Sequence, residues 1–183
     1  MTASIAYKFL ARDATAPLSG SAWPLPQGGA PGAWVEAGAG ALELCVRGAH
    51  VCRPSDLSYW LHEDLWQVEV AGEQIEGIDC LVVRQARLVG RLDGWREGGA
   101  AARFADACIA HGAGLVAAAP ARAALNAYLD DAAEAARYGY VAVAAFAAAL
   151  AVGKTAGAGD GGDRAYRAER AWQSAWIARE LAL

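Results

Sequence analysis

The sequence predicts an α+β fold, in which a small mixed or antiparallel N-terminal sheet with one short helix precedes an alanine-rich helical bundle. Tryptophan, valine and turn residues dominate as far as residue 96, whereas 32 of the 47 alanines lie beyond residue 100. A chain of 183 residues is long enough to bury a core without metals or disulfides. We therefore expect a β-rich α+β domain over residues 1–96 and an alanine-rich helical region packed on it over residues 97–183.

Short apolar segments separated by Gly and Pro predict five or six strands in the N-terminal part. The first is IAYKFLA, and AWVEA and LELCVRGAHVC look extended, the latter broken by Gly48. The stretch LWQVEVAG alternates as a half-buried strand does, with Trp66, Val68 and Val70 on one face. One or two further strands come from DCLVVRQARLVGRLDGW. Between these, RPSDLSYWLHED predicts a short helix with Ser55 as its N-cap.

The second part predicts four helices, near residues 99–118, 121–137, 139–153 and 163–182. The last has Asp163 as its cap and an apolar stripe into which Glu169 intrudes. The segment GAGDGGD, at 157–163, predicts a flexible loop. Alanine-rich helices bury little area each, so the bundle needs aromatic anchors, which we expect to be Phe104, Tyr128, Tyr138, Phe146, Trp172 and Trp176.

Charge and hydropathy exclude several classes of partner. The net charge of -4 gives no basic footprint for nucleic acid or for an anionic membrane surface. The longest apolar run, at 141–153, is too short to span a bilayer, and the N-terminus lacks the pattern of a signal peptide. Four cysteines at 45, 52, 80 and 108 do not form a secreted disulfide framework. We expect a soluble bacterial protein of the cytoplasm, with reduced thiols.

The segment CVRGAHVC, at 45–52, concentrates groups that could carry chemistry. Cys45, His50 and Cys52 offer three zinc ligands, with Cys80 or His62 as the fourth, but this spacing is not that of common structural zinc sites. A nucleophilic cysteine could instead use His50 or His62 as its base. The simplest interpretation is that both cysteines are small buried residues of a strand, so we expect no metal and no cofactor.

His50 is the stronger candidate for ligand binding. It lies near the end of an expected strand, and Tyr59 and Trp60 belong to the short helix that follows. Glu69 lies on the next strand, on the face opposite Val68. A strand–helix–strand unit this short predicts a cleft lined by His50, Tyr59, Trp60 and Glu69, although a structural role for His50 is an open alternative.

Two resemblances concern this same region. The stretch CVRGAHVCRPSDLSYWLHEDLWQVEVAGE contains Cys-x-x-Gly-x-His-x-Cys, a short helix and an LW-x-VE strand, and it resembles a segment of uncharacterised bacterial and phage proteins. The order of elements through VVRQARLVGRLDGW is similar to the second half of small ADP-ribosyltransferase-like domains, over about 50 residues. That likeness implies a transferase scaffold that uses NAD, with Glu69 as the available glutamate. The first strand, AYKFLARD, departs from the Arg or His-Gly-Thr-like turn of those enzymes.

Three functions follow as expectations. The first is a small-ligand-binding protein, with nucleotide-type ligands the favoured class. The second is a non-catalytic interaction or assembly protein that forms a homo-oligomer through its C-terminal helices. The third is a transferase on an ADP-ribosyltransferase-like scaffold. Clustered polar groups around His50 favour a ligand site, whereas exposure of Trp172 and Trp176 would favour an oligomer contact.

Overall fold

The computed structural model describes residues 4–157 and 159–183, and the chain divides into two compact units, residues 1–98 and 99–183. A five-stranded antiparallel sheet lies in the N-terminal unit and four long helices follow, which confirms the α+β prediction. The flexible loop predicted at 157–163 includes position 158, which lies outside the described residues. The last helix already begins at Asp160, inside this predicted loop.

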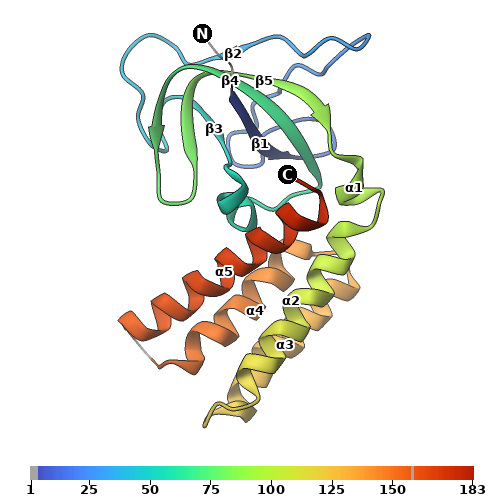
Figure 1. Ribbon diagram of the computed structural model, residues 1–183, viewed down its shortest axis with the longest axis vertical. Helices are drawn as coiled ribbons and strands as arrows, with labels where there is room; N and C mark the ends of the chain where they lie inside the picture. Colours follow the sequence, from blue (N-terminus) through green and yellow to red (C-terminus); the bar gives the residue numbers. More distant parts are fainter. Residues whose placement is uncertain (1–3, 158) are drawn as a thin grey trace. The chain divides into compact units, whose positions relative to one another are not determined.

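The sheet of the N-terminal unit contains β1 (Ser4–Leu10), β2 (Val35–Glu36), β3 (Ala49–Val51), β4 (Asp64–Glu76) and β5 (Leu81–Arg91). The strand order is β1-β4-β5-β2, and β3 also pairs with β5. The long strands β4 and β5 form a strongly curved hairpin (Figure 1).

Two hydrogen bonds join β3 back to β1, so the sheet closes into a ring of four strands. The Cys52 amide donates to the Tyr7 carbonyl at 2.7 Å, and the Tyr7 amide donates to the Cys52 carbonyl at 2.9 Å. Each of β1, β4, β5 and β3 therefore has a neighbour on both sides. Closure leaves few unpaired backbone groups and encloses a core between the strands.

A β-bulge produces part of this curvature. The pairing of β4 with β5 shifts between Ala71 and Gln74, where Gly72 and Glu73 face the single residue Arg84. Gly72 has a φ of 81°, and a Cβ built there would lie 2.9 Å from the Cβ of Arg84. A glycine is therefore needed at the point where β4 bends.

The core of the sheet contains small and branched side chains from all four strands of the ring. Val68 and Val70 of β4 are buried, as the alternation in LWQVEVAG predicted, but Trp66 is only partly buried. The remaining members are Ala6, Leu10, Ala14, Ala16, Trp23, Ala49, Val51, Leu81, Val83, Ala86 and Leu88.

The short helix is a 3₁₀ helix, η1 (Pro54–Tyr59), and it does not begin where the sequence suggested. Arg53 precedes it, and its amide donates to Oδ2 of Asp56 at 2.9 Å. The Arg53 guanidinium also donates to both carboxylate oxygens of Asp56, at 2.8 and 3.1 Å. The prediction of Ser55 as the N-cap was wrong, because Asp56 reaches back to the Arg53 amide and Pro54 supplies the first helical position.

The helical unit consists of α2 (Ala100–Val116), α3 (Arg122–Arg137), α4 (Val141–Thr155) and α5 (Asp160–Glu180). Helix α4 contacts each of the other three helices, and six of its alanines are buried. Methyl side chains allow helix axes to approach closely, so α4 forms the centre of this unit (Figure 1).

The expected aromatic anchors divide into two groups. Phe104 is fully buried and lies 5.5 Å from the half-buried Trp176, between ring centroids. Tyr138 and Phe146 were wrongly predicted to be anchors, since 69% and 47% of these residues are exposed. The alanines of α4 already fill the interior, so the larger Phe146 lies on the outer face of that helix.

We expect Trp95, in the short helix α1 (Asp93–Arg96), to be essential for the N-terminal unit. It is 1% exposed, its Nε1 donates to the His62 carbonyl at 3.0 Å, and its ring meets Phe9 edge to face. Trp95→Ala should lower the free energy of unfolding by about 3–5 kcal/mol in equilibrium urea unfolding, the range for a buried tryptophan. The half-buried Trp34 is the matched control, and Trp34→Ala should cost about 1–2 kcal/mol. Equal losses in the two variants would contradict the assignment.

Candidate functional site

The structure gives His50 two backbone partners. The Cys45 amide donates to its Nε2 at 3.0 Å, and Nδ1 lies 3.2 Å from the Gly48 carbonyl. This arrangement fits a neutral ring with its proton on Nδ1. Burial lowers the pKa of His50, and the nearby charge of Lys8 lowers it further, against the hydrogen bond to Gly48. Both ring nitrogens are therefore engaged in holding the turn before β3.

The other predicted pocket residues are also held by specific contacts. Glu69 accepts from Nε of Arg87 at 2.6 Å, and that guanidinium lies over the ring of Trp34. Trp60 packs against a small cluster that contains Val82, and its Nε1 donates to the Asp79 carbonyl. Tyr59 ends η1 and is half-buried.

The sheet register separates His50 from Glu69. His50 pairs with Val82 and Glu69 pairs with Arg87, which is five residues further along β5. At about 3.3 Å per residue, these two positions lie about 16 Å apart along the strand. His50 and Trp60 lie beside the same cluster, but Glu69 belongs to a different part of the sheet.

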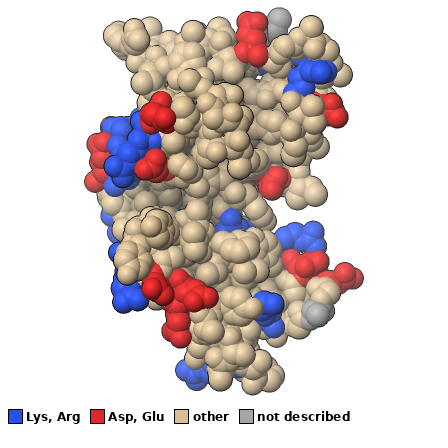
Figure 2. All heavy atoms as spheres, turned by 180° about the vertical axis from the view of Figure 1, so that it is seen from behind, with Lys and Arg blue, Asp and Glu red and all other residues tan. Residues whose placement is uncertain are grey.

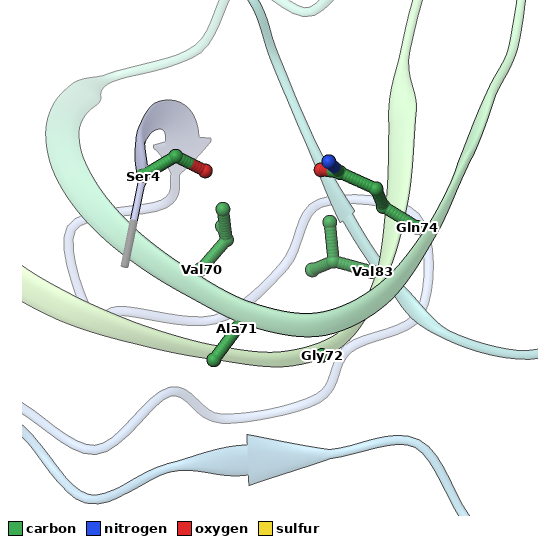
Figure 3. A pocket seen from close by; sticks show the side chains of 6 residues that line it. All are labelled: Ser4, Val70, Ala71, Gly72, Gln74 and Val83. Atoms are coloured by element: carbon green, nitrogen blue, oxygen red, sulfur yellow. The ribbon is translucent and has the colours of Figure 1, made fainter. Parts of the chain in front are cut away.

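A small hollow lies on the concave side of β4, next to the bulge. Figure 3 shows the side chains of Ser4, Val70, Gln74 and Val83 directed into it, whereas Ala71 points away. Its volume is about 60 Å³, which suits a few water molecules but not a nucleotide. None of the four residues of the predicted cleft lines this hollow.

Lys8 is an unusual cation in the same unit. Its amine donates to the His50 carbonyl at 2.7 Å and lies 4.8 Å from the centroid of the Trp23 ring. Burial lowers the pKa of Lys8 to about 8, while the nearby Cys52 acts in the opposite direction. The contacts with the carbonyl and the indole explain how this amine is accommodated beside the core.

A histidine–glutamate pair in the helical unit is the stronger candidate site. Nδ1 of His111, on α2, lies 2.8 Å from Oε2 of Glu169, on α5. The Glu169 side chain is fully buried, whereas 32% of the His111 side chain is exposed. The imidazole stacks on Trp172, with 3.8 Å between ring centroids and 5° between ring planes. Within the described part of the chain, Nε2 of His111 has no hydrogen-bond partner and is not one of the buried unpaired nitrogen atoms, so this nitrogen is open to a ligand.

Further buried polar side chains on α5 support this pair. Nε2 of Gln173 donates to the Ala145 carbonyl on α4 at 2.9 Å and lies 3.5 Å from Oε1 of Glu169. Nη1 of Arg170 donates to Oε1 of Gln173 at 2.8 Å. Glu169, Arg170 and Gln173 are 2%, 5% and 0% exposed. This network crosses a unit whose interior is otherwise mainly alanine, and burying so many polar groups is costly unless each is hydrogen-bonded.

The electrostatics of Glu169 follow from this environment. Burial raises its pKa, and the interactions with His111, Gln173 and Arg170 act in the opposite direction. A carboxyl group with a raised pKa stabilises the fold fully below its ordinary pKa, and that contribution is lost as the pH rises toward the raised value. The ionised carboxylate therefore depends on His111.

Only one feature of the sequence points to the His111–Glu169 site. Glu169 interrupts the apolar stripe of the last helix, as noted above, but nothing in the sequence pairs it with His111, 58 residues earlier. Only the packing of α2 against α5 brings the two side chains together.

Charged side chains on the face shown in Figure 2 gather in groups of mixed sign. The ion pairs of Arg53, Arg84, Arg87, Arg91 and Arg96 with acidic side chains account for most of the arginines of the N-terminal unit. Among the described residues, no three His, Cys, Asp or Glu side chains converge as metal ligands do. No helix in the described ranges combines the length and apolar character needed to cross a membrane.

Comparison with known proteins adds no further assignment. The chain matches none of the protein-family models, curated proteins or solved structures with which it was compared.

We expect His111→Phe to reveal the dependence of Glu169 on its partner. Phenylalanine keeps an aromatic ring against Trp172 but removes Nδ1, so the carboxylate loses its hydrogen bond. The variant should lose about 1–3 kcal/mol of unfolding free energy at pH 8, the cost of an unpaired buried acceptor. At pH 5 the loss should be smaller, because Glu169 can then be protonated. Chemical unfolding at the two pH values measures this, and the difference should vanish when Glu169→Gln is the common background.

Proposed function

We propose that the protein binds a small anionic ligand of nucleotide type at the His111–Glu169 pair of its helical unit. The observation that carries this proposal is a half-exposed imidazole held between a buried carboxylate and the face of Trp172. Packing alone does not require such a pair, since well-packed apolar side chains often stabilise a protein interior as well as buried ionic groups do.

The chemistry of the pair suits an anion. A carboxylate that accepts a hydrogen bond from Nδ1 fixes the orientation of the imidazole ring. With an anionic ligand bound, the imidazolium form can donate from Nε2 to a phosphate or carboxylate oxygen in a charge-assisted hydrogen bond. The half-buried indole of Trp172 offers an aromatic surface next to this donor, which suits a ligand that also carries a flat ring.

A titration followed by NMR tests the proposal. Adenosine monophosphate should shift the Hε1 resonance of His111 in a saturable manner at concentrations up to about 1 mM, which corresponds to roughly 4 kcal/mol of binding free energy. Inorganic phosphate should produce a weaker shift and adenosine the weakest, because each carries only one of the two recognised groups. Trp172→Phe should weaken the nucleotide response, and His111→Phe should abolish binding measured by calorimetry.

His62 provides the control, because it lies in the other unit and His62→Phe should leave binding unchanged. Equal responses to phosphate and the nucleotide would contradict recognition of the flat ring. Binding by His111→Phe with unchanged affinity, or no response to any of the three probes, would overturn the proposal.

A second function, assembly of a homo-oligomer through the C-terminal helices, is favoured by a different observation. Tyr138, Tyr140, Val143 and Phe146 lie within nine residues at the junction of α3 and α4, and each is 47–69% exposed. The two tyrosine rings lie 6.3 Å apart. Large apolar side chains that cluster on a surface are typical of a contact with another protein, here a second copy of the chain.

Light scattering coupled to size-exclusion chromatography tests this second function. The unmodified protein should have at least twice the chain mass of 19.0 kDa, and Tyr140→Ser combined with Phe146→Ser should reduce it to one chain. Leu115→Ser, at an exposed residue of α2, is the control and should leave the mass unchanged. A monomeric unmodified protein would exclude this function.

A transferase function would require Glu69 to leave its ion pair with Arg87. A cytoplasmic protein is supported by the four free thiols, three of which are buried, and a bacterial origin by the alanine-rich, lysine-poor composition.

A further inference from the structure

We infer that Cys52 and Cys80 form a cross-strand thiol pair that a small disulfide can oxidise to an intramolecular disulfide. Neither residue belongs to the proposed ligand site, since both lie in the N-terminal unit.

The sheet register brings the two cysteines opposite each other. Along the β3–β5 ladder Ala49 pairs with Val83, His50 with Val82 and Val51 with Leu81. One further step places Cys52, directly after β3, against Cys80, directly before β5. Opposed residues of an antiparallel pair project from the same face, so both thiols lie on one side of the sheet.

The backbone hydrogen bonds define which kind of pair this is. Cys52 directs both its amide and its carbonyl to Tyr7, on the side away from β5. The Cys80 carbonyl accepts from the Gly77 amide at 2.8 Å, on the side away from β3. The two residues therefore form a non-hydrogen-bonded pair, for which the Cα atoms are typically about 4.5 Å apart. That separation lies within the range of protein disulfides, about 4.4–6.8 Å.

The surroundings explain why the thiols are stable when reduced. Cys52 and Cys80 are 3% and 4% exposed, and burial raises the pKa of both. A charge on Cys80 would raise the pKa of Cys52 further. Thiols of this kind react slowly with external reagents. Cys80 directly follows a turn in which Ile78 is 93% exposed, so a local opening of this turn would bring its thiol into contact with an external disulfide.

The reaction has two exchange steps. The Cys80 thiolate attacks one sulfur of oxidised glutathione, its S–S bond breaks, and one glutathione thiolate leaves and takes up the proton that Cys80 lost. The Cys52 thiolate then attacks the Cys80 sulfur of the mixed disulfide and releases the second glutathione in the same way. Two protein thiols are oxidised and one small disulfide is reduced to two thiols.

Oxidation with glutathione disulfide, followed by alkylation in denaturant and intact mass measurement, tests the inference. The chain should lose about 2 Da, two of its four cysteines should resist alkylation, and dithiothreitol should restore all four. Peptide mapping should identify a bond between Cys52 and Cys80. The oxidised protein should also unfold at a higher temperature than the reduced protein, because the bond constrains the unfolded chain.

The matched control removes the other two cysteines. Cys45→Ala combined with Cys108→Ala should form the bond as readily as the unmodified chain, whereas Cys52→Ser should not. A Cys45–Cys80 bond, a bond between chains, or four alkylated cysteines after prolonged oxidation would each overturn the inference. These outcomes are independent of ligand binding at His111.

Discussion

The Glu169 carboxylate lies out of water among small apolar side chains, and its burial determines which neighbours the helical unit must keep in place. His111 and Gln173 supply the nearby polar groups, and the Gln173 side chain is anchored in turn on a carbonyl of α4. This requires α2, α4 and α5 to approach closely, which the alanines of α4 allow. The same small side chains that make the unit compact therefore also make room for an extended polar network.

The N-terminal unit depends on a different constraint, the closure of its sheet. Tyr7 and Cys52 exchange two hydrogen bonds, and the bulge at Gly72 gives β4 the bend that closure needs. His50 contributes by fixing the turn before β3 through its ring nitrogens. The segment CVRGAHVC thus has a structural role that its residue types alone do not reveal, since cysteine and histidine are equally typical of metal sites.

Local patterns in the sequence predict much of the fold but little of the candidate site. Alternation at Val68 and Val70 and the alanine-rich segments predict strands and helices correctly, because both depend on residues close in sequence. The extended segment predicted for LELCVRGAHVC was too long. Cys45 has a φ of 62° and lies in a turn, which few features of the sequence indicate. The His111–Glu169 pair depends on helix packing, and the partners of His50 are backbone groups, so residue types alone predict neither.

The pairing of β1 also has a consequence for the order in which the chain folds. The strand β1, Ser4–Leu10, finds its ladder partners only at residues 64–70, about 60 residues later in the chain. During synthesis β1 must remain without this partner until the middle of the N-terminal unit has emerged from the ribosome. Contacts between residues so distant in sequence slow folding, whereas the helices beyond residue 99 form from local contacts. The second half of the chain, although made after the first, can therefore acquire its secondary structure faster.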